Sequence, residues 1–353
     1  MKIGILTHPV RCNYGGALQA YALQQYLQRR GYEAVIIDCH RKASVLSQLH
    51  HMVERNIFHR HFTRFATQYM CRTPRVVSDA HLQQVAADLD AVIVGSDQVW
   101  RLSMVRGVER HYFLDFAPQG ARRIAYAASF GLSDLEPCEA QLYEDIKQLV
   151  SQFTAVSVRE KDGVDICRKH WDVSATQVLD PTLLAGREVF DPLAAQAAPS
   201  AGTLFYYFLG NRSADVAQLQ QIATAAGKRA FTVNAGKALR VSKFTFAFYP
   251  AVEEWVRAFR DADCVVTDSF HGVCFALLYR KPFYVLGHNQ GGVSRITSIL
   301  DMLGLPERYV QSLEALPTYD SYAAPTIDYD TIYSRLEALR NDSELFINNA
   351  LKR

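Results

Sequence analysis

The sequence predicts an α/β protein made of two Rossmann-like domains. The chain has 353 residues, more than the ~250–300 residues at which a single hydrophobic core usually stops growing. Its first 40 residues show a strand, a turn with two glycines, a helix and a second strand, and such a βαβ unit requires a parallel sheet. The same alternation of strands and helices begins again near residue 202. These three observations predict the fold class.

The first domain is expected over residues 1–185, as a doubly wound sheet. Apolar residues at helical spacing predict its first helix at residues 17–30, and Gly31 ends that helix. Short apolar runs predict the strands, at residues 2–7, 33–38, 91–95, 123–127, 155–158 and 177–180.

A linker is expected at residues 186–201, because this segment is rich in Ala and Pro. The second α/β domain is expected over residues 202–353, with terminal helices. Its strands are predicted at residues 203–209, 230–233, 264–267 and 282–286. Its helices are predicted at residues 216–226, 252–262, from 272 onward and at 331–350.

Composition excludes several classes of protein. A net charge of +2 argues against a nucleic-acid partner held by bulk electrostatics. The seven cysteines form no CxxC pair, so neither a disulfide framework nor a zinc site is predicted. The apolar stretch at the N-terminus is too short for a signal peptide, and no run of ~18 apolar residues occurs. We therefore expect a cytoplasmic protein without a metal or another cofactor.

Residues 44–72 form a basic stretch with an amphipathic pattern. An apolar face is predicted from Val53, Ile57, Phe58, Phe62 and Phe65, with Arg55, Arg60 and Arg64 among them. One interpretation is a helix that packs on the domain. The other is a peripheral contact with anionic lipid at the inner face of the membrane, or with an acceptor substrate.

Three polar turns follow predicted strands, which is where ligands bind in open α/β sheets. The first is Asn13-Tyr14-Gly15-Gly16, whose glycines let backbone N–H groups approach an anion or a sugar hydroxyl. A purely structural turn is the alternative. The turn lacks the G-x-G-x-x-G pattern, so nicotinamide binding is not expected.

The second turn is Gly95-Ser96-Asp97-Gln98. Ser96 and Asp97 are suited to cap the next helix. Alternatively, Asp97 is placed to accept a proton from a hydroxyl nucleophile.

The third turn is Thr267-Asp268-Ser269-Phe270-His271-Gly272. Asp268 or Ser269 caps the following helix, which places His271 in the first helical turn. A histidine there either binds phosphate or carboxylate, transfers a proton, or is only structural.

Two further cations follow strands. Arg295 is a candidate for bidentate anion recognition, and Arg159 is either an anion ligand or half of an exposed ion pair.

Six motifs together resemble the polysaccharide pyruvyl transferase family, in the order that the family shows. They begin with Asn13-Tyr14-Gly15-Gly16-Ala17-Leu18-Gln19, Gly95-Ser96-Asp97-Gln98-Val99-Trp100, and Ile124-Ala125-Tyr126-Ala127-Ala128-Ser129-Phe130-Gly131. They continue with Ser157-Val158-Arg159-Glu160-Lys161, Val178-Leu179-Asp180-Pro181-Thr182, and Val266-Thr267-Asp268-Ser269-Phe270-His271-Gly272. The resemblance extends from residue 3 to about residue 305.

The resemblance implies a fold like that of GT-B glycosyltransferases, with two domains facing a cleft. The first domain would take the acceptor and the second the donor. It implies transfer of a pyruvyl group from phosphoenolpyruvate to two hydroxyls of a sugar, which forms a cyclic ketal on a cell-surface or exopolysaccharide precursor. His271 matches the family's histidine and Asp97 its acidic residue. One departure is a missing cation: related enzymes often carry Arg-Leu-His-Gly at this turn, where this chain has Ser269-Phe270-His271-Gly272.

The resemblance leads to a hypothesis for each site residue. His271 acts as the acid or activates phosphate, and Asp97 is the hydroxyl base. Arg159 and Arg295 hold the anionic donor, in place of the missing arginine. Substrate contacts are expected from Asn13, Tyr14, Gly15, Gly16, Ser96, Ser129, Arg159, Asp268, Ser269, Gly272 and Arg295.

Two alternative functions remain open from the sequence. One is a GT-B-type glycosyltransferase that uses a nucleotide sugar. The other is a non-catalytic binding protein of a polysaccharide assembly system. The expected partners of the favoured function are phosphoenolpyruvate and a sugar acceptor, which is lipid-linked in one version of the hypothesis.

Overall fold

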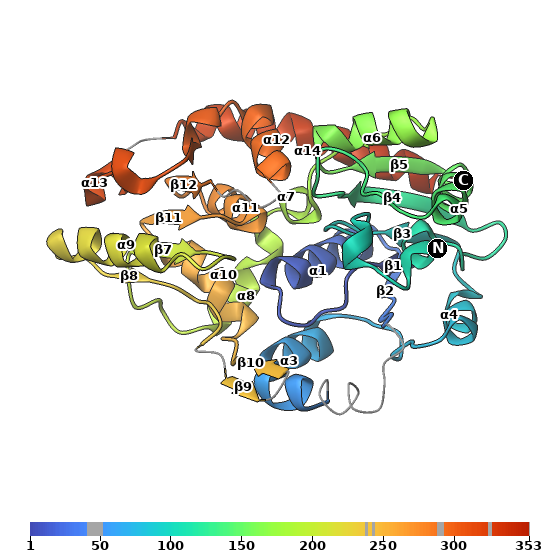
Figure 1. Cartoon of the computed structure of the whole chain (residues 1–353), viewed down its shortest axis with the longest axis horizontal. Helices are drawn as coiled ribbons and strands as arrows, with labels where there is room; N and C mark the ends of the chain where they lie inside the picture. The colour runs from blue at the N-terminus through green and yellow to red at the C-terminus, as the bar shows by residue number, and fades with distance from the viewer. Residues whose placement is uncertain (41–51, 237–238, 242–243, 288–292, 324–326, 353) are drawn as a thin grey trace. The chain divides into compact units, whose positions relative to one another are not determined.

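The computed structural model describes residues 1–40, 52–236, 239–241, 244–287, 293–323 and 327–352 (Figure 1). The chain divides into two compact units. Unit 1 consists of Met1–Met52, Thr63–Ala185 and Ala338–Arg353. Unit 2 consists of Val53–Phe62 and Gly186–Glu337.

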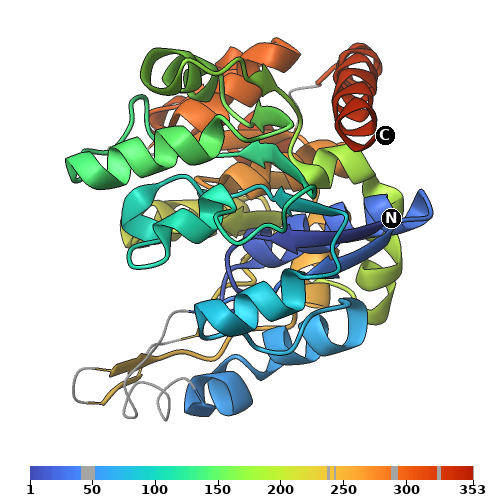
Figure 2. The same ribbon diagram turned by 90° about the vertical axis from the view of Figure 1, so that its right-hand side faces the viewer.

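Unit 1 contains a six-stranded parallel sheet with the order β2-β1-β3-β4-β5-β6. Its strands are β1 (Lys2–Leu6), β2 (Glu33–Ile36), β3 (Ala91–Val94), β4 (Arg122–Ala128), β5 (Ala155–Val158) and β6 (Thr176–Gln177). The central strand β3 is buried along its whole length, as expected for a parallel sheet covered on both faces. Figure 2 shows helices around this sheet. They are α1 (Tyr14–Arg29), α4 (Asp79–Ala86), α5 (Ala140–Val150), α6 (Lys161–Trp171) and α7 (Pro181–Ala185), with short turns η2 (Leu102–Met104) and η3 (Glu109–Phe113).

Helix α1 begins earlier than the sequence predicts. Asn13 is its N-cap, and the Asn13 side-chain oxygen accepts a hydrogen bond from the Gly16 backbone N–H at 3.0 Å. Tyr14, Gly15 and Gly16 therefore lie in the first helical turn and not in a preceding loop. Glycine in a helix is unfavourable by propensity, so propensity alone placed the start of the helix too late.

Unit 2 contains a five-stranded parallel sheet with the order β13-β12-β11-β7-β8. Its strands are β7 (Leu204–Tyr207), β8 (Ala230–Phe231), β11 (Cys264–Thr267), β12 (Phe283–Leu286) and β13 (Tyr309–Val310). The sequence analysis missed β13 and also the antiparallel hairpin of β9 (Leu239–Val241) and β10 (Phe244–Phe246). The helices are α9 (Ser213–Ala225), α10 (Val252–Asp261), α11 (Phe270–Leu278), α12 (Val293–Leu303) and α13 (Tyr319–Ala323), with η5 (Pro306–Arg308) and η6 (Leu313–Ala315).

The segment 186–201, predicted as a linker, is largely structured. It holds η4 (Arg187–Val189) and α8 (Asp191–Gln196) and belongs to unit 2. Phe190, Leu193 and Ala194 within it are buried. The Ala-rich composition therefore reflects a small packed helix, because alanine is the strongest helix former.

The C-terminal helix α14 (Tyr329–Leu351) corrects the predicted domain assignment, because Ala338–Arg353 belongs to unit 1. The Leu179 backbone N–H donates to Ser343 Oγ at 3.0 Å, and Arg122 donates to the Ala350 carbonyl at 3.1 Å. Both contacts join residues that are far apart in the sequence, so periodicity could not have revealed them.

The basic stretch does not form one continuous amphipathic helix in its described part. Residues 41–51 lie outside the described residues, and η1 (Glu54–Phe58) is followed by α3 (Arg60–Tyr69). Phe62 and Phe65 are buried, whereas Ile57 is 49% exposed. The predicted common apolar face is therefore wrong for Ile57, which lies in the π-helical turn η1 and not in α3. No described helix is long and apolar enough to cross a membrane.

Candidate functional site

In each sheet, the chain first adds a strand on one side of the starting strand and then adds strands on its other side. The strand order therefore reverses at one point in each sheet. In unit 1 this point lies between β1 and β3, and in unit 2 between β7 and β11. Ligands of doubly wound proteins bind outside the carboxyl ends of the strands at such points. The residues that follow these four strands are therefore the candidates for a functional site.

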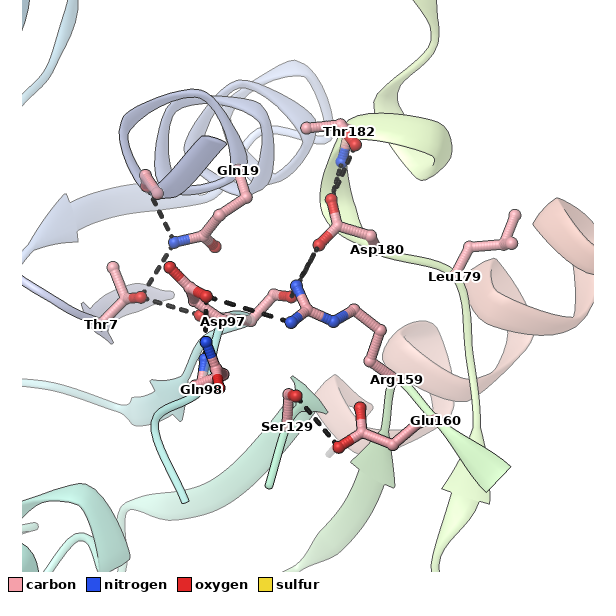
Figure 3. A network of polar contacts seen from close by, with 12 residues as sticks. Thr7, Gln19, Asp97, Gln98, Ser129, Arg159, Glu160, Leu179, Asp180 and Thr182 are labelled. Carbon is pink, nitrogen blue, oxygen red and sulfur yellow. Dashed lines mark hydrogen bonds and ion pairs between the residues drawn. The ribbon is translucent and has the colours of Figure 1, made fainter. Parts of the chain in front are cut away.

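In unit 1, hydrogen bonds join the ends of β1 and β3 to helix α1 (Figure 3). Thr7 Oγ1 donates to the Ser96 carbonyl at 2.9 Å. Gln19 Nε2 donates to Thr7 Oγ1 at 2.9 Å and to the Gly16 carbonyl at 3.0 Å. All of these side chains are buried. The first two predicted turns are thus held together by one buried polar network.

Arg159 lies at the centre of this network, at the end of β5. Its guanidinium donates to Asp180 Oδ2 at 3.1 Å and to Ser96 Oγ at 3.3 Å, and its Nη2 lies 3.9 Å from Asp97 Oδ1 (Figure 3). Burial alone would lower the pKa of Arg159, but the carboxylates of Asp180, Asp97 and Glu160 raise it. Arg159 is 3% exposed. We therefore interpret it as a buried counter-ion that orients Asp97, and not as a direct ligand of the donor.

Asp97 has an unusual backbone conformation. Its φ of 85° lies in the region that favours glycine, and such strain persists in functional sites where neighbouring contacts enforce it. Here the Ser129 backbone N–H donates to the Asp97 carbonyl at 3.0 Å, and the Gln98 N–H donates to Asp97 Oδ1 at 2.9 Å. Asp97 thus lies in a strained turn. It does not cap a helix, since no helix follows directly.

Gly16 allows the first turn of α1 to approach the Asp97 carboxylate. A Cβ atom at Gly16 would lie 3.2 Å from Asp97 Oδ2 and 3.2 Å from the Asn13 side chain. Positive charge at a helix N-terminus stabilises a nearby carboxylate as an anion. Asn13 and Gly16 of the first motif and Asp97 of the second are therefore neighbours. Tyr14 and Gly15 are buried in the same turn.

Ser129 contacts a second buried carboxylate. Ser129 Oγ donates to Glu160 Oε1 at 3.0 Å, and the N–H groups of Phe130 and Gly131 donate to the same oxygen at 2.7 and 3.0 Å. Gly131 is required here, since its φ is +67° and a Cβ would lie 2.2 Å from Gln98 Oε1. Glu160 thus holds the loop after β4 against the Asp97 turn.

The cluster around Asp97 is acidic. It contains three buried carboxylates, those of Asp97, Asp180 and Glu160, and one guanidinium, that of Arg159. Such a cluster repels an anionic ligand and suits a ligand with hydroxyl groups, which donate hydrogen bonds to carboxylates.

In unit 2, the end of β7 is tied to the end of β11. The Leu209 backbone N–H donates to Asp268 Oδ1 at 2.7 Å, and Arg212 Nε lies 3.5 Å from Asp268 Oδ2. Arg212 Nη2 also donates to the carbonyls of Gly287 and Leu286, at 2.6 and 3.3 Å. Asp268 therefore positions Arg212 at the carboxyl edge of this sheet, directly before helix α9.

The third predicted turn begins helix α11. Ser269 is the N-cap, and its Oγ accepts from the Gly272 N–H at 3.4 Å. His271 lies in the first helical turn, 6% exposed, with its ring 5.3 Å from that of Phe270 in an edge-to-face arrangement. Gly272 packs against Thr267, because a Cβ there would lie 2.3 Å from Thr267 Oγ1. Gly272 is thus required for close packing of α11 on β11.

Arg295 lies in the first turn of α12, which follows β12, and is half-buried. Because β12 pairs with β11 in parallel, Arg295 lies at the same edge of the sheet as His271. Residues 288–292, which connect β12 to α12, lie outside the described residues. Among the described residues, no group of three or more His, Cys, Asp or Glu side chains is arranged to hold a metal ion.

Sequence reasoning assigned no role to several residues of these networks, of which Gln19, Glu160 and Asp180 occur in the quoted motifs and Thr7 and Arg212 do not. Arg212 could have been found, since it follows the predicted strand at residues 203–209 after the loop Gly210-Asn211. The buried pair of Ser96 and Asp180, 84 residues apart in the sequence, has no local signal.

Comparisons with known proteins were made for the whole chain. A family model described as polysaccharide pyruvyl transferase matches residues 13–290. A search of curated proteins finds no match. Among solved structures, UDP-N-acetylglucosamine 2-epimerase from Rickettsia bellii is similar with a TM-score of 0.52 and 11% identity, over 99% of this chain and 96% of that chain.

A second similar structure is that of UGT73P12 from Glycyrrhiza uralensis, complexed with glycyrrhetinic acid 3-O-monoglucuronide. Its TM-score is 0.50 at 9% identity, over 98% of this chain and 91% of that chain. At such identities the likeness concerns the fold alone. It confirms the predicted α/β fold of the GT-B type with two Rossmann-like domains.

Proposed function

Because the chain belongs to the polysaccharide pyruvyl transferase family, and is therefore a transferase, we propose that it moves a pyruvyl group from phosphoenolpyruvate to a sugar. The product is a pyruvate ketal on two hydroxyls of a cell-surface or exopolysaccharide precursor, carried on a lipid or a nucleotide. The observation that carries this proposal is the difference in charge between the two candidate sites. The Asp97 cluster has three buried carboxylates and one guanidinium, whereas the edge of the other sheet presents Arg212, paired with Asp268 and Asp215, beside two helix N-termini.

The donor is a small molecule with a phosphate and a carboxylate, so it requires positive charge. Helices α9 and α11 both begin at the switch point of unit 2, and N–H groups at helix N-termini favour anions. Arg212 adds a guanidinium at the start of α9, held by Asp268, Asp215 and two carbonyls. We assign to Arg212, together with Arg295, the charge that the arginine of the Arg-Leu-His-Gly form would supply.

The reaction follows from the electronic structure of phosphoenolpyruvate. His271 donates a proton to the methylene carbon, which gives the neighbouring carbon oxocarbenium character. A sugar hydroxyl attacks that carbon and transfers its proton to Asp97. The carbon–oxygen bond to phosphate breaks, the second hydroxyl closes the ketal, and its proton passes to the leaving phosphate. The proton held by Asp97 returns to His271 through solvent. The products are the ketal and inorganic phosphate.

The test measures inorganic phosphate released from phosphoenolpyruvate with a panel of lipid-linked and nucleotide-linked sugars. His271→Ala is expected to lower turnover by roughly 10²-fold or more, because general acid catalysis contributes about that much. Near-normal turnover of this variant would contradict the assignment of His271.

In a thermal-shift titration, phosphoenolpyruvate is expected to stabilise the protein. Stabilisation by UDP or UDP-sugars instead would favour a glycosyltransferase, and no stabilisation by either would favour a binding protein.

Arg212→Ala is expected to raise the KM for phosphoenolpyruvate by about tenfold to a hundredfold, since a hydrogen bond to a charged group contributes ~1.5–3 kcal/mol. Arg212→Lys should recover part of the loss. Arg229→Ala is the matched control, because the Arg229 side chain is exposed just before β8. An unchanged KM in Arg212→Ala, with an unchanged unfolding temperature, would remove Arg212 from the donor site.

A further inference from the structure

Unit 2 exposes large apolar side chains beside η1. Ile57 is 49% exposed and Phe248 is 56% exposed. The rings of Phe58 and Phe248 lie 4.7 Å apart, and the Tyr249 backbone N–H donates to the Phe58 carbonyl at 3.4 Å. The segment after the β9–β10 hairpin is therefore fixed against η1 (Figure 1). We call the surface formed by Ile57, Phe58, Arg60 and Phe248 the arm surface.

The residues of the arm surface belong to two stretches of the sequence that carry an excess of positive charge. Residues 41–77 contain seven Lys or Arg and a single Glu. Residues 216–252 contain five Lys or Arg and neither Asp nor Glu. The net charge of the whole chain, +2, does not show this local excess of positive charge. In the described part, Arg60 and Arg64 are exposed one turn apart on α3.

We propose that the arm surface binds the headgroup region of an anionic phospholipid bilayer. Exposed apolar side chains among arginines are the pattern of interfacial membrane contacts, in which apolar groups enter the acyl boundary and cations pair with lipid phosphates. An anionic polysaccharide is also attracted by positive charge. It provides no apolar phase, however, for an exposed isoleucine, so the pair Ile57 and Phe248 favours a membrane.

This contact is separate from the proposed chemistry, because no residue of the arm surface belongs to either candidate site. The membrane contact adds to the proposed function only by bringing the protein close to its acceptor. A protein held at a bilayer meets lipid-linked precursors at raised local concentration.

The experiment is flotation of the full chain with vesicles of phosphatidylcholine alone and of phosphatidylcholine mixed with phosphatidylglycerol. Binding is expected only to the anionic vesicles, and to weaken with salt, because salt screens exposed charges. The double variant Ile57→Ser with Phe248→Ser should lower binding by about tenfold or more. Leu345→Ser is the matched control, since Leu345 is 58% exposed on α14.

A second variant tests the charges. Arg60→Glu with Arg64→Glu should lower binding by about tenfold, whereas Arg106→Glu, at an exposed arginine of unit 1, should not. Equal binding to both kinds of vesicle, or binding that survives the Ile57 and Phe248 changes, would overturn the proposal. So would retention by soluble dextran sulfate without binding to vesicles. Phosphate release with a water-soluble sugar acceptor should be normal in all these variants, which separates a failure here from a failure of the proposed function.

Discussion

Asp97 illustrates how individual residues of this protein depend on their neighbours. Its strained backbone is held by Ser129, and its carboxylate lies near Arg159 and the first turn of α1. These contacts hold the carboxylate in one orientation, which the proposed general base requires. The local sequence Gly95-Ser96-Asp97 shows none of this.

Asp97→Asn is expected to lower phosphate release by roughly 10²–10⁴-fold, because the amide keeps the shape of the side chain but cannot accept the hydroxyl proton. The thermal shift caused by phosphoenolpyruvate should be retained. Asp165→Asn is the control, since Asp165 forms only an exposed pair with Arg168. Turnover of Asp97→Asn within a few-fold of the unchanged protein would exclude Asp97 as the base.

At the scale of elements, helix α1 joins several parts of unit 1. Asn13 caps the helix, Gly16 approaches Asp97, and Gln19 donates to Thr7 one turn later. The cap therefore fixes the start of the helix at the position where its N-terminus meets the Asp97 turn. The sequence analysis left a structural and a substrate-binding role open for Asn13, and the cap supports the structural one.

Asn13→Ala is expected to lower the free energy of unfolding by about 1 kcal/mol, since a lost N-cap costs about that much. Asn13→Asp should keep the stability, because aspartate caps equally well. Denaturant unfolding of both variants measures the difference. Equal stability of Asn13→Ala and the unchanged protein would show that the cap contributes nothing, and would return Asn13 to a substrate role.

At the scale of the whole molecule, both units contain carboxylates whose ionised form is stabilised by folding. Asp38 of unit 1 lies 2.8 Å from His40 and 3.3 Å from Arg72. Burial alone would raise its pKa, but the hydrogen bond from His40 and the nearby positive charges lower it. Asp261 of unit 2 also has a lowered pKa, because the bond from Arg257 and the Ser200 N–H outweigh burial.

These shifts predict how stability depends on pH. A carboxyl group with a lower pKa in the folded state contributes stability that is fully present above its unfolded pKa of about 3.9. That contribution is lost as pH falls through the folded pKa. The unfolding temperature should therefore decline below about pH 4, and Asp38→Asn should reduce the decline. An Asp38→Asn variant with the same acid decline as the unchanged protein would contradict this origin.

The sequence by itself determined the alternation of strands and helices, the family, and the turns that contain His271 and Asp97. These features are local, because hydrophobic runs, helical spacing and capping residues act over a few positions. It did not reveal which charges would be buried. Arg159, predicted as an anion ligand, lies against Asp180, while Arg212, not predicted at all, lies at the edge of the second sheet.

Only the tertiary structure decided these positions, and the reason is the order of the strands. Placing β1 beside β3, and β7 beside β11, brings together side chains from motifs tens of residues apart, such as Ser96 and Asp180. The same packing moves the end of α14 into unit 1 through Ser343. Pairings of this kind depend on the whole sheet, whereas the sequence patterns describe one element at a time.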